Sequence, residues 1–249
     1  MGILRASLRP FPIGTLPPLE QATQHAGSPE PLALGAIMED MLTIHHLPAS
    51  RSHRILWLME ELGLPYALET YERDPQTMRA APELARHSPF GKAPAIVDGT
   101  LALTESGGII AHILDRYGES RLQPEPGTDA GSRHAMLMHM AEATAMPALM
   151  VDLIETMGAQ VPQAIRWLPG PTGAEVLEQL ADMLGEQSYI LGDELTAADI
   201  QLWFVLRTAS SRPDFTDHPT LGVYLARLEA RSAFLAAVAR GGPVEMQAG

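Results

Sequence analysis

The chain has 249 residues, of which 46% are hydrophobic, so it is long enough for one large domain or two smaller ones with a real core. Its formal net charge of −13 argues against a nucleic-acid partner and an anionic membrane surface, because both need a clustered basic face. There is no cysteine, which excludes a structural disulfide, a thiolate metal site and any chemistry in which the protein supplies the thiol.

The first forty residues differ from the rest. Residues 1–40 are rich in proline and glycine and have no sustained period of 2 or 3.6, so we expect a flexible extension. Prolines interrupt the run that a secretory signal would need. We favour the explanation that residues 1–40 come from a non-native or mis-assigned start of the chain upstream of Met41. The alternative is that they form a transit peptide. We see no uninterrupted apolar run near the ~20 residues of a membrane helix.

From Met41 the pattern becomes strand, helix, strand. Residues 42–47 alternate as a strand, and residues 51–62 place apolar side chains on one helical face with Gly63 as the stop. Residues 66–72 form the second strand, which predicts a right-handed parallel unit. A weaker helix is predicted over residues 77–86.

The next stretch, residues 88–110, predicts a hairpin followed by a helix. Two short apolar runs flank Asp98-Gly99, the strongest short-range hairpin signal. Pro94 lies at the strand start, where proline is tolerated and a cis bond costs little. The helix over residues 105–117 begins at Glu105 and Ser106, and its free N–H groups favour a carboxylate-bearing ligand. The order βαβαββα is that of a thioredoxin-like domain.

Beyond a Pro/Gly linker, residues 119–131, the chain reads as an all-helical domain over residues 132–242 with a tail at 243–249. We predict helices over 133–157, kinked by Pro147, and over 175–186, 220–230 and 232–239, with a loop near 169–173. The long segment carries five methionines that either line an adaptable pocket or, as we favour for most, pack in the core or a dimer contact: Met136, Met138, Met140, Met146 and Met150.

The stretch Leu195–Ile200 predicts a helix start that is stabilised by a capping box. Thr196 can cap the first turn while Asp199 reaches back to it, and Leu195 can pack on Ile200. We interpret this motif as important for folding and not for chemistry.

Three stretches carry a family resemblance: LTIHHLPASRSHRILWLMEELGLPYAL, PELARHSPFGKAPAIVDGTLALTESGGIIAHILDRYG and SYILGDELTAADIQLW. Over residues 41 to about 242 the chain resembles cytosolic glutathione S-transferases, most of all bacterial and fungal members with a Ser-Arg segment after the first strand. The resemblance implies an α/β thioredoxin-like domain that binds glutathione, an all-α domain that shapes the second-substrate pocket, and a cytoplasmic homodimer.

The resemblance also implies the glutathione-binding residues. Pro94 would be the cis-proline, and Ala93 would pair its backbone with the cysteinyl part of glutathione. Glu105 and Ser106 would hold the γ-glutamyl end, and Lys92 would lie near the glycyl carboxylate. Two structural alternatives stay open: Ser106 as a helix cap worth ~1 kcal/mol, and Lys92 as a solvated turn residue.

The catalytic question is how the glutathione thiol ionises, because at its ordinary pKa of ~8.5 it is mostly protonated at neutral pH. A helix N-terminus and a hydroxyl or guanidinium donor can lower that pKa. The first strand has no tyrosine and the chain no cysteine, so Ser50 is the expected thiolate donor, with Arg51 and Ser52 as alternatives. Either serine can instead cap the helix, and Arg51 can point to solvent.

The expected function is therefore a glutathione S-transferase acting on a small electrophile or hydroperoxide. A glutathione-dependent disulfide reductase or peroxidase, and a non-catalytic glutathione-binding regulatory protein, are the alternatives. Gly107-Gly108 weakens the helix after the Glu-Ser pair by up to ~1 kcal/mol per residue. We expect no metal site, because His45 and His46 face opposite sides of a strand and the remaining histidines show no HxxxH-type spacing with a carboxylate.

Overall fold

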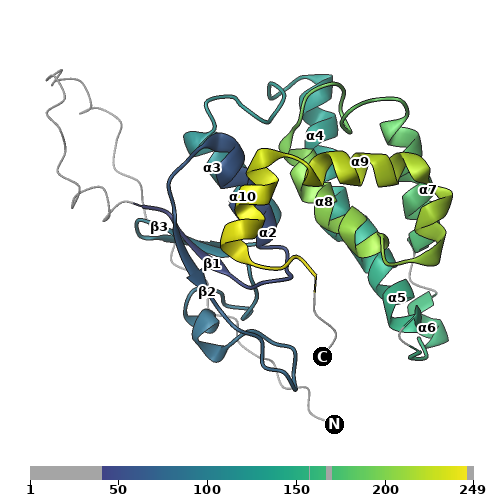
Figure 1. The fold of residues 1–249 in the computed structure, drawn as a ribbon, viewed down its shortest axis with the longest axis horizontal. Helices are drawn as coiled ribbons and strands as arrows, with labels where there is room; N and C mark the ends of the chain where they lie inside the picture. Colours follow the sequence, from purple (N-terminus) through teal and green to yellow (C-terminus); the bar gives the residue numbers. More distant parts are fainter. Residues whose placement is uncertain (1–40, 157, 167–169, 246–249) are drawn as a thin grey trace, which may run out of the picture.

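The computed structural model describes residues 41–156, 158–166 and 170–245. The predicted extension over residues 1–40 and the last four residues of the predicted tail lie outside this part of the chain. Figure 1 shows a sheet and its helices at one end of the described chain and a helical bundle at the other. The predicted combination of a thioredoxin-like α/β part with an all-helical part is confirmed.

The first part follows the predicted order of strands and helices. Its elements are β1 (Thr43–His46), α2 (His53–Leu62), β2 (Ala67–Thr70), η1 (Pro82–Arg86), β3 (Ala95–Asp98), β4 (Leu101–Thr104) and α3 (Ser106–Tyr117). The sheet has the strand order β2-β1-β3-β4, in which β1 and β2 are parallel and the other two pairs are antiparallel. As predicted, the parallel pair is joined through α2, and connections of this type are right-handed as a rule.

The predicted hairpin is present. Asp98 pairs with Leu101 at its closed end, and Gly99 has φ 61°, a left-handed conformation that glycine adopts at little cost. The Asp98 carboxylate also accepts hydrogen bonds from Tyr117 Oη at 2.8 Å and His112 Nε2 at 2.7 Å. The turn residue therefore fixes α3 against the hairpin as well.

The predicted helix over residues 77–86 is wrong for its first half. Only the short 3₁₀ helix η1 forms, and before it Arg73 and Ala80 make an isolated antiparallel bridge. Pro82 explains the difference, because proline disfavours the helical conformation in the residue before it, and Ala81 has φ −52° and ψ 143°. This segment runs irregularly across one side of the sheet.

All the named elements in the described residues of the second part are helices. Its elements are α4 (Asp129–Met140), η2 (Ala141–Ala145), α5 (Met146–Thr156), α6 (Gln163–Arg166), α7 (Gly173–Leu184), α8 (Ala197–Ala209), η3 (Pro213–Asp217), α9 (Pro219–Glu229) and α10 (Ser232–Gly241). The predicted long helix thus starts earlier, inside the predicted linker, where the Thr128 side chain accepts from Gly131 N–H at 3.0 Å.

A π-helical turn, η2, interrupts this long helix immediately before the predicted kink. Pro147 has no N–H to donate, so the preceding turn cannot keep a regular α-helical ladder. The methionines of the segment separate: Met146 is buried, whereas Met136 and Met150 are 49% and 39% exposed. Most of them therefore do not share one pocket.

By length and composition alone, one helix in the described part of the chain, Asp129–Glu155, could cross a membrane. The sequence predicted no such stretch. One third of its apolar window is buried within the protein, and core helices of water-soluble proteins pass the same test. This criterion on its own assigns the helix no place in a membrane.

The two parts share a buried boundary around α2, α8 and α10. Trp57 of α2 and Trp203 of α8 are fully buried, and both rings meet Phe234 of α10 edge-on at 5.3 and 5.1 Å between centroids. Helix α10 packs along α2, as Figure 1 shows. The chain therefore returns at its C-terminal helix to cover the first part.

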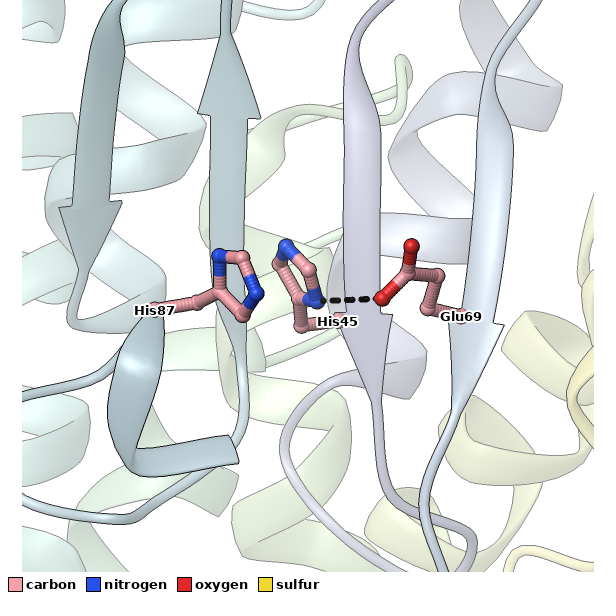
Figure 2. A group of neighbouring side chains, drawn as sticks. All are labelled: His45, Glu69 and His87. Atoms are coloured by element: carbon pink, nitrogen blue, oxygen red, sulfur yellow. Dashed lines mark ion pairs between the residues drawn. The ribbon is translucent and has the colours of Figure 1, made fainter. Parts of the chain in front are cut away.

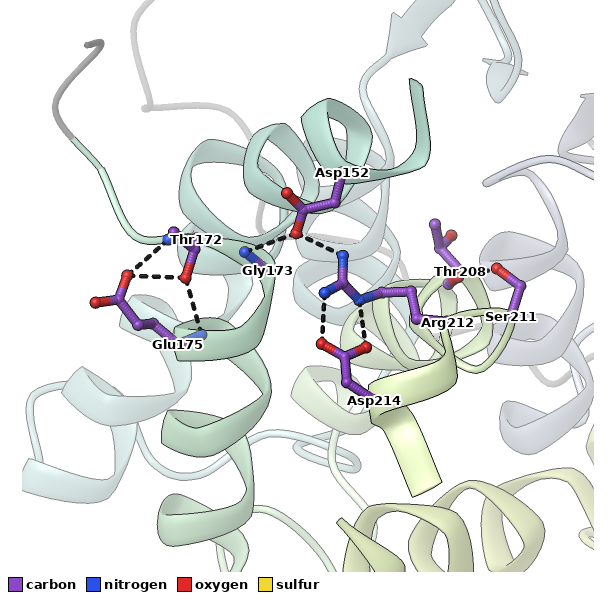
Figure 3. A network of polar contacts seen from close by, with 8 residues as sticks. All are labelled: Asp152, Thr172, Gly173, Glu175, Thr208, Ser211, Arg212 and Asp214. Atoms are coloured by element: carbon purple, nitrogen blue, oxygen red, sulfur yellow. Dashed lines mark hydrogen bonds and ion pairs between the residues drawn. The ribbon is translucent and has the colours of Figure 1, made fainter. Parts of the chain in front are cut away.

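Polar caps and bridges fix the far end of the bundle (Figure 3). Thr172 and Glu175 form a capping box at the start of α7, with Thr172 N–H donating to the Glu175 carboxylate at 2.8 Å. Arg212 bridges Asp152 of α5 and Asp214 of η3. Asp152 also accepts from Gly173 N–H at 3.0 Å, so one carboxylate joins α5, α7 and η3.

The predicted motif at the start of α8 is confirmed. Thr196 N–H and its hydroxyl both donate to Asp199 Oδ2, at 2.7 and 2.9 Å. The other carboxylate oxygen of Asp199, Oδ1, accepts from Ile190 N–H at 2.9 Å and from the Tyr224 hydroxyl. Asp199 is 0% exposed, so it links the turn before α8 to α9 from inside the core.

Candidate functional site

The loop between β1 and α2 holds the two candidate serines. Ser50 Oγ donates to the Leu47 carbonyl at 2.7 Å and lies 2.8 Å from Ser52 Oγ. Ser52 Oγ accepts from Leu47 N–H at 3.1 Å. Helix α2 begins after Ser52, whose side chain makes no capping hydrogen bond, so the alternative of a side-chain N-cap is not how Ser52 is used.

His46 determines what the Ser52 hydroxyl can do. Its Nε2 lies 2.8 Å from the Gly241 carbonyl, which can only accept, so the proton sits on Nε2. Burial, followed by the nearby His53, lowers the pKa of His46 to about 4, so the ring is neutral around pH 7. Its Nδ1 must then accept, and Ser52 Oγ at 2.7 Å supplies the proton.

This assignment separates the two serines. A hydroxyl has one proton, and Ser52 gives its proton to His46. Ser52 is also fully buried. Ser50 keeps a proton that can turn between two acceptors, and its side chain lines a cleft. Only Ser50 of the pair can therefore offer a proton to a group in that cleft.

Arg51 and Arg54 are one helical turn apart and meet the same carboxylate. Arg51 Nε donates to Glu142 at 2.9 Å, and Arg54 Nη1 donates to Glu142 Oε1 at 2.5 Å. The Arg54 side chain is fully buried, and burial, opposed by Glu142, lowers its pKa to about 10. Burial alone would raise the pKa of Glu142, but the positive charges of Arg54 and Arg51 outweigh it and lower that pKa. The pair is thus ionised at pH 7 and joins α2 to η2.

Arg54 also reaches Ser106, the first residue of α3. Arg54 Nη1 donates to Ser106 Oγ at 3.0 Å, and that hydroxyl donates to Gln201 Oε1 at 3.3 Å. Ser106 is buried, so its hydroxyl is held between the two parts of the protein. The sequence did not single out Arg54, Glu142 or Gln201, and only the spacing of Arg54 from Arg51 on one helix face could have suggested the first.

The loop before β3 places the next three candidates. The Ala93–Pro94 peptide bond is cis, as predicted. Lys92 is exposed, and its backbone N–H donates to Ser88 Oγ at 3.1 Å. Lys92 and Ala93 line the same cleft as Ser50, whereas Pro94 is buried behind it.

Glu105 lies just outside that cleft. It is exposed and has φ 70° and ψ 113°, a strained conformation for a residue with a side chain. It lines a separate groove of about 560 Å³ between α3 and α4, with Glu142 and Gln201. Despite Gly107-Gly108, α3 starts at Ser106, and a Cβ on Gly107 would only touch Gln201 at 3.7 Å.

The cleft beside Ser50 has a volume of about 670 Å³ and an unusual charge. Four cationic residues and one carboxylate, Asp74, line it; the cations are Arg51, Arg73, Arg79 and Lys92. The Asp74 carboxylate is occupied, because it accepts from Gln76 and Thr77 N–H at 2.8 and 2.9 Å. In a chain of net charge −13, this concentration of positive charge favours an anionic ligand.

Comparison with known proteins gives consistent matches. Residues 50–116 match the model of the glutathione S-transferase N-terminal domain. Glutathione S-transferase 3 of Schizosaccharomyces pombe is 30% identical over 183 residues, which are 68% of this chain and 74% of the yeast protein. Glutathione S-transferase 1 of Saccharomyces cerevisiae is 26% identical over 221 residues, 79% and 93% of the two chains.

Solved structures agree in fold. A glutathione S-transferase from Actinobacillus pleuropneumoniae has a TM-score of 0.73 and 32% identity, covering 82% of this chain and 95% of the other. A glutathione transferase family member from Pseudomonas fluorescens, solved with two glutathione bound, has a TM-score of 0.67 at 22% identity over 80% and 93% of the chains. The second shows similarity of fold alone.

Proposed function

The chain belongs to the glutathione S-transferase family, and on that premise we propose that it binds glutathione in the cleft beside Ser50 and lowers the pKa of the glutathione thiol. One observation carries this proposal. Ser50, whose hydroxyl keeps a movable proton, opens onto the cationic cleft that also contains Lys92 and Ala93. Glutathione is a peptide with two carboxylates, so a positive cleft suits it.

The orientation of glutathione follows from where its groups find partners. The Ala93 backbone would pair with the cysteinyl residue, and Lys92 would neutralise the glycyl carboxylate. Ser106, with the N-terminus of α3 and Arg54 behind it, would receive the γ-glutamyl carboxylate. Glu105, which lines the neighbouring groove and is exposed, would supply negative charge for the α-ammonium, which accounts for an acidic group beside a carboxylate ligand.

The chemical step would proceed as follows. Ser50 turns its proton from the Leu47 carbonyl to the glutathione sulfur, and the N-terminus of α2 adds its positive end. Both favour the thiolate over the thiol, whose proton passes to solvent water. The thiolate then attacks an electrophilic carbon, forming a C–S bond while the electron pair of the broken bond leaves with the leaving group. Arg51 is placed to stabilise that charge from the edge of the cleft.

The test is the ultraviolet absorbance of the glutathione thiolate bound to the protein, followed as pH is varied. In the wild-type protein we expect the bound thiol to titrate at about 6.5–7.5 in place of ~8.5, and Ser50→Ala to remove most of that shift. Ser211→Ala is the matched control, because this exposed serine donates only to the Thr208 carbonyl of its own helix end (Figure 3).

Three other results would contradict parts of the proposal. A wild-type shift that survives Ser50→Ala would remove Ser50 from its role and leave Arg51 or Ser52. Tight binding of glutathione with an unshifted thiol would instead support the non-catalytic regulatory alternative. Turnover with hydroperoxides but not with aryl halides would support the peroxidase alternative.

The assembly and setting of the protein are proposed on the same basis. The cytoplasm holds reduced glutathione, and a chain without cysteine suits it. We expect a homodimer, for which the groove between α3 and α4 offers a surface of small and apolar residues, among them Ala111, Ala135 and Met138.

A further inference from the structure

A second group of chemically reactive side chains lies apart from the residues of the Ser50 network. His45 of β1, Glu69 of β2 and His87 at the end of η1 each bring one ligand atom within 4.8 Å of the other two (Figure 2). His45 and Glu69 are direct neighbours in the paired register of β1 and β2. The sheet itself therefore holds two of the three groups together.

The distances suit a small cation. His45 Nδ1 and Glu69 Oε2 are 3.3 Å apart. Zinc ligands at ~2.0–2.1 Å in a tetrahedron are separated by about 3.3–3.4 Å, so this edge already has the right length. The His87 ring is half-buried at the surface, so a change in its side-chain angles can bring a nitrogen the remaining distance without movement of the sheet.

We propose that His45, Glu69 and His87 form a binding site for a divalent transition-metal ion of the zinc type. Two imidazoles and one carboxylate are a ligand set that zinc uses, with water or a further group in the fourth position. This proposal goes beyond the proposed glutathione chemistry and does not depend on it. The sequence argument against metal weighed His45 with His46 and looked for HxxxH-type spacing among the other histidines, whereas the partners of His45 come from other elements of the fold.

The surroundings of the site also fit a cation. Burial, followed by the nearby His87, lowers the pKa of His45. The Tyr71 hydroxyl donates to Glu69 Oε2 at 3.1 Å and lies 2.9 Å from His45 Nδ1, so it already contacts the two atoms that would ligate the ion. His45 Nε2 is buried without a hydrogen-bond partner, so the polar groups of this ring are incompletely satisfied in the metal-free protein.

Metal binding would change two features. The rings of His45 and His87 are stacked, 3.8 Å between centroids and 15° between planes, and His87 must leave that stack to direct a nitrogen at the ion. The proton on His45 Nδ1 must move to Nε2 or to solvent, because the ion takes the Nδ1 lone pair. Both changes give signals that do not depend on enzyme activity.

The site would join three separate pieces of chain. It ties β1 and β2 to the end of η1, and the irregular segment between β2 and β3 includes Arg73, Asp74 and Arg79, which line the cleft. A bound ion would therefore hold one wall of the cleft against the sheet. His46, on the opposite face of β1, keeps its contact with α10.

The experiment uses the untagged full chain, treated with a chelator and then titrated with Zn²⁺ alone in calorimetry, without glutathione. We expect one equivalent to bind, the melting temperature to rise with Zn²⁺ concentration, and Co²⁺ to give the visible bands of a tetrahedral ion. His87→Ala and Glu69→Gln should each weaken binding at least about 10-fold. Both positions are partly exposed, so these variants should fold where His45→Ala could fail.

His139→Ala is the control, because this histidine is exposed on α4 and should leave Zn²⁺ affinity unchanged. The proposal is overturned if no Zn²⁺ binds, or if wild type, His87→Ala and Glu69→Gln bind it with equal affinity. In an ¹⁵N spectrum of the histidine rings, the shifts of His45 and His87 should move together on adding Zn²⁺. Movement of other histidines alone would equally refute the site.

Discussion

His46 shows how one side chain connects the end of the chain to the candidate site. Its two nitrogens are committed to Gly241 on one side and Ser52 on the other. A protonated ring would have to donate from both nitrogens, and Ser52 would then need to turn its own proton elsewhere. The neutral ring is therefore part of the arrangement that leaves Ser50 able to donate.

This arrangement predicts a specific loss of stability in acid. The pKa of His46 is about 4 in the folded protein and ~6.5 when unfolded, so the unfolded chain binds the proton more readily. The neutral His46 ring therefore adds on the order of 3 kcal/mol to the free energy of unfolding above pH 6.5. This stabilisation is lost as the pH falls from 6.5 towards 4. Urea unfolding of wild type at pH 7.5 and 4.5 should show this loss, and His46→Gln should show less of it.

His139→Ala serves as the control and should keep the wild-type difference between the two pH values, since its ring is exposed. Equal acid sensitivity in wild type and His46→Gln would count against a buried neutral His46. So would a nuclear magnetic resonance titration that puts the pKa of this ring near 6.5.

The sequence put Ser50 ahead of Ser52 as the expected thiolate donor but gave no physical reason for a difference between them. Ser50 and Ser52 have the same side chain, and their different roles depend on a contact of His46 with a carbonyl 195 residues later. Such a contact leaves no local pattern. Lys92, Ala93 and the cis-proline were located from the family resemblance, because they lie in one short loop whose composition is distinctive.

At the scale of elements, α8 depends on a single carboxylate. Asp199 receives two hydrogen bonds from Thr196, one from Ile190 and one from Tyr224 of α9. The sequence predicted the contacts within the motif, since they follow from spacing along one helix turn. It did not predict those to Ile190 and Tyr224, which depend on packing.

Replacing Asp199 with alanine should therefore cost more than an ordinary cap. We expect about 3 kcal/mol, since several buried hydrogen bonds to a charged group are lost, against about 1 kcal/mol for a cap alone. Urea unfolding at pH 7.5 measures it. Glu175→Ala is the matched control, because it removes the acid of the exposed capping box of α7 (Figure 3). If both variants lose the same amount, the internal contacts of Asp199 add nothing.

Elements without a capping motif that can be recognised in the sequence were predicted less well. Residues 77–81 contain good helix formers, yet Pro82 prevents a helix from continuing through Ala81. The π-turn η2 was foreseen only as a kink, because proline shows where a helix is disturbed and not how the lost hydrogen bond is replaced.

For the whole molecule, the joint between the two parts contains a buried charge pair. Arg54 of α2 is completely buried, and its charge is balanced by Glu142 of η2, whose side chain is 31% exposed. Arg51 adds a second bond to the same carboxylate. No local pattern in the sequence links these residues, because they are 88 positions apart.

Removing Glu142 should therefore weaken the joint. Glu142→Gln leaves the buried Arg54 charge uncompensated, and we expect a loss of about 2 kcal/mol, less than for a fully buried pair because Glu142 is partly exposed. Glu178→Gln, on the exposed side of α7, should change stability by less than about 0.5 kcal/mol. Equal unfolding free energies for the two variants in urea would show that the pair contributes little.

The contacts of the C-terminal segment with the β1–α2 loop also determine how long the loop must wait for its partners during synthesis of the chain. Gly241 accepts from His46, and Pro243 accepts from Ala49 N–H at 2.9 Å. A ribosome adds roughly 5–20 residues per second, so the 195 residues between His46 and Gly241 take about 10–40 s to synthesise. During that interval His46 of the nascent β1–α2 loop has no acceptor for its Nε2 proton, so its tautomer, and with it the direction of the Ser52 hydroxyl, is not yet fixed. The β1–α2 loop is therefore translated well before the C-terminal helix that completes its contacts.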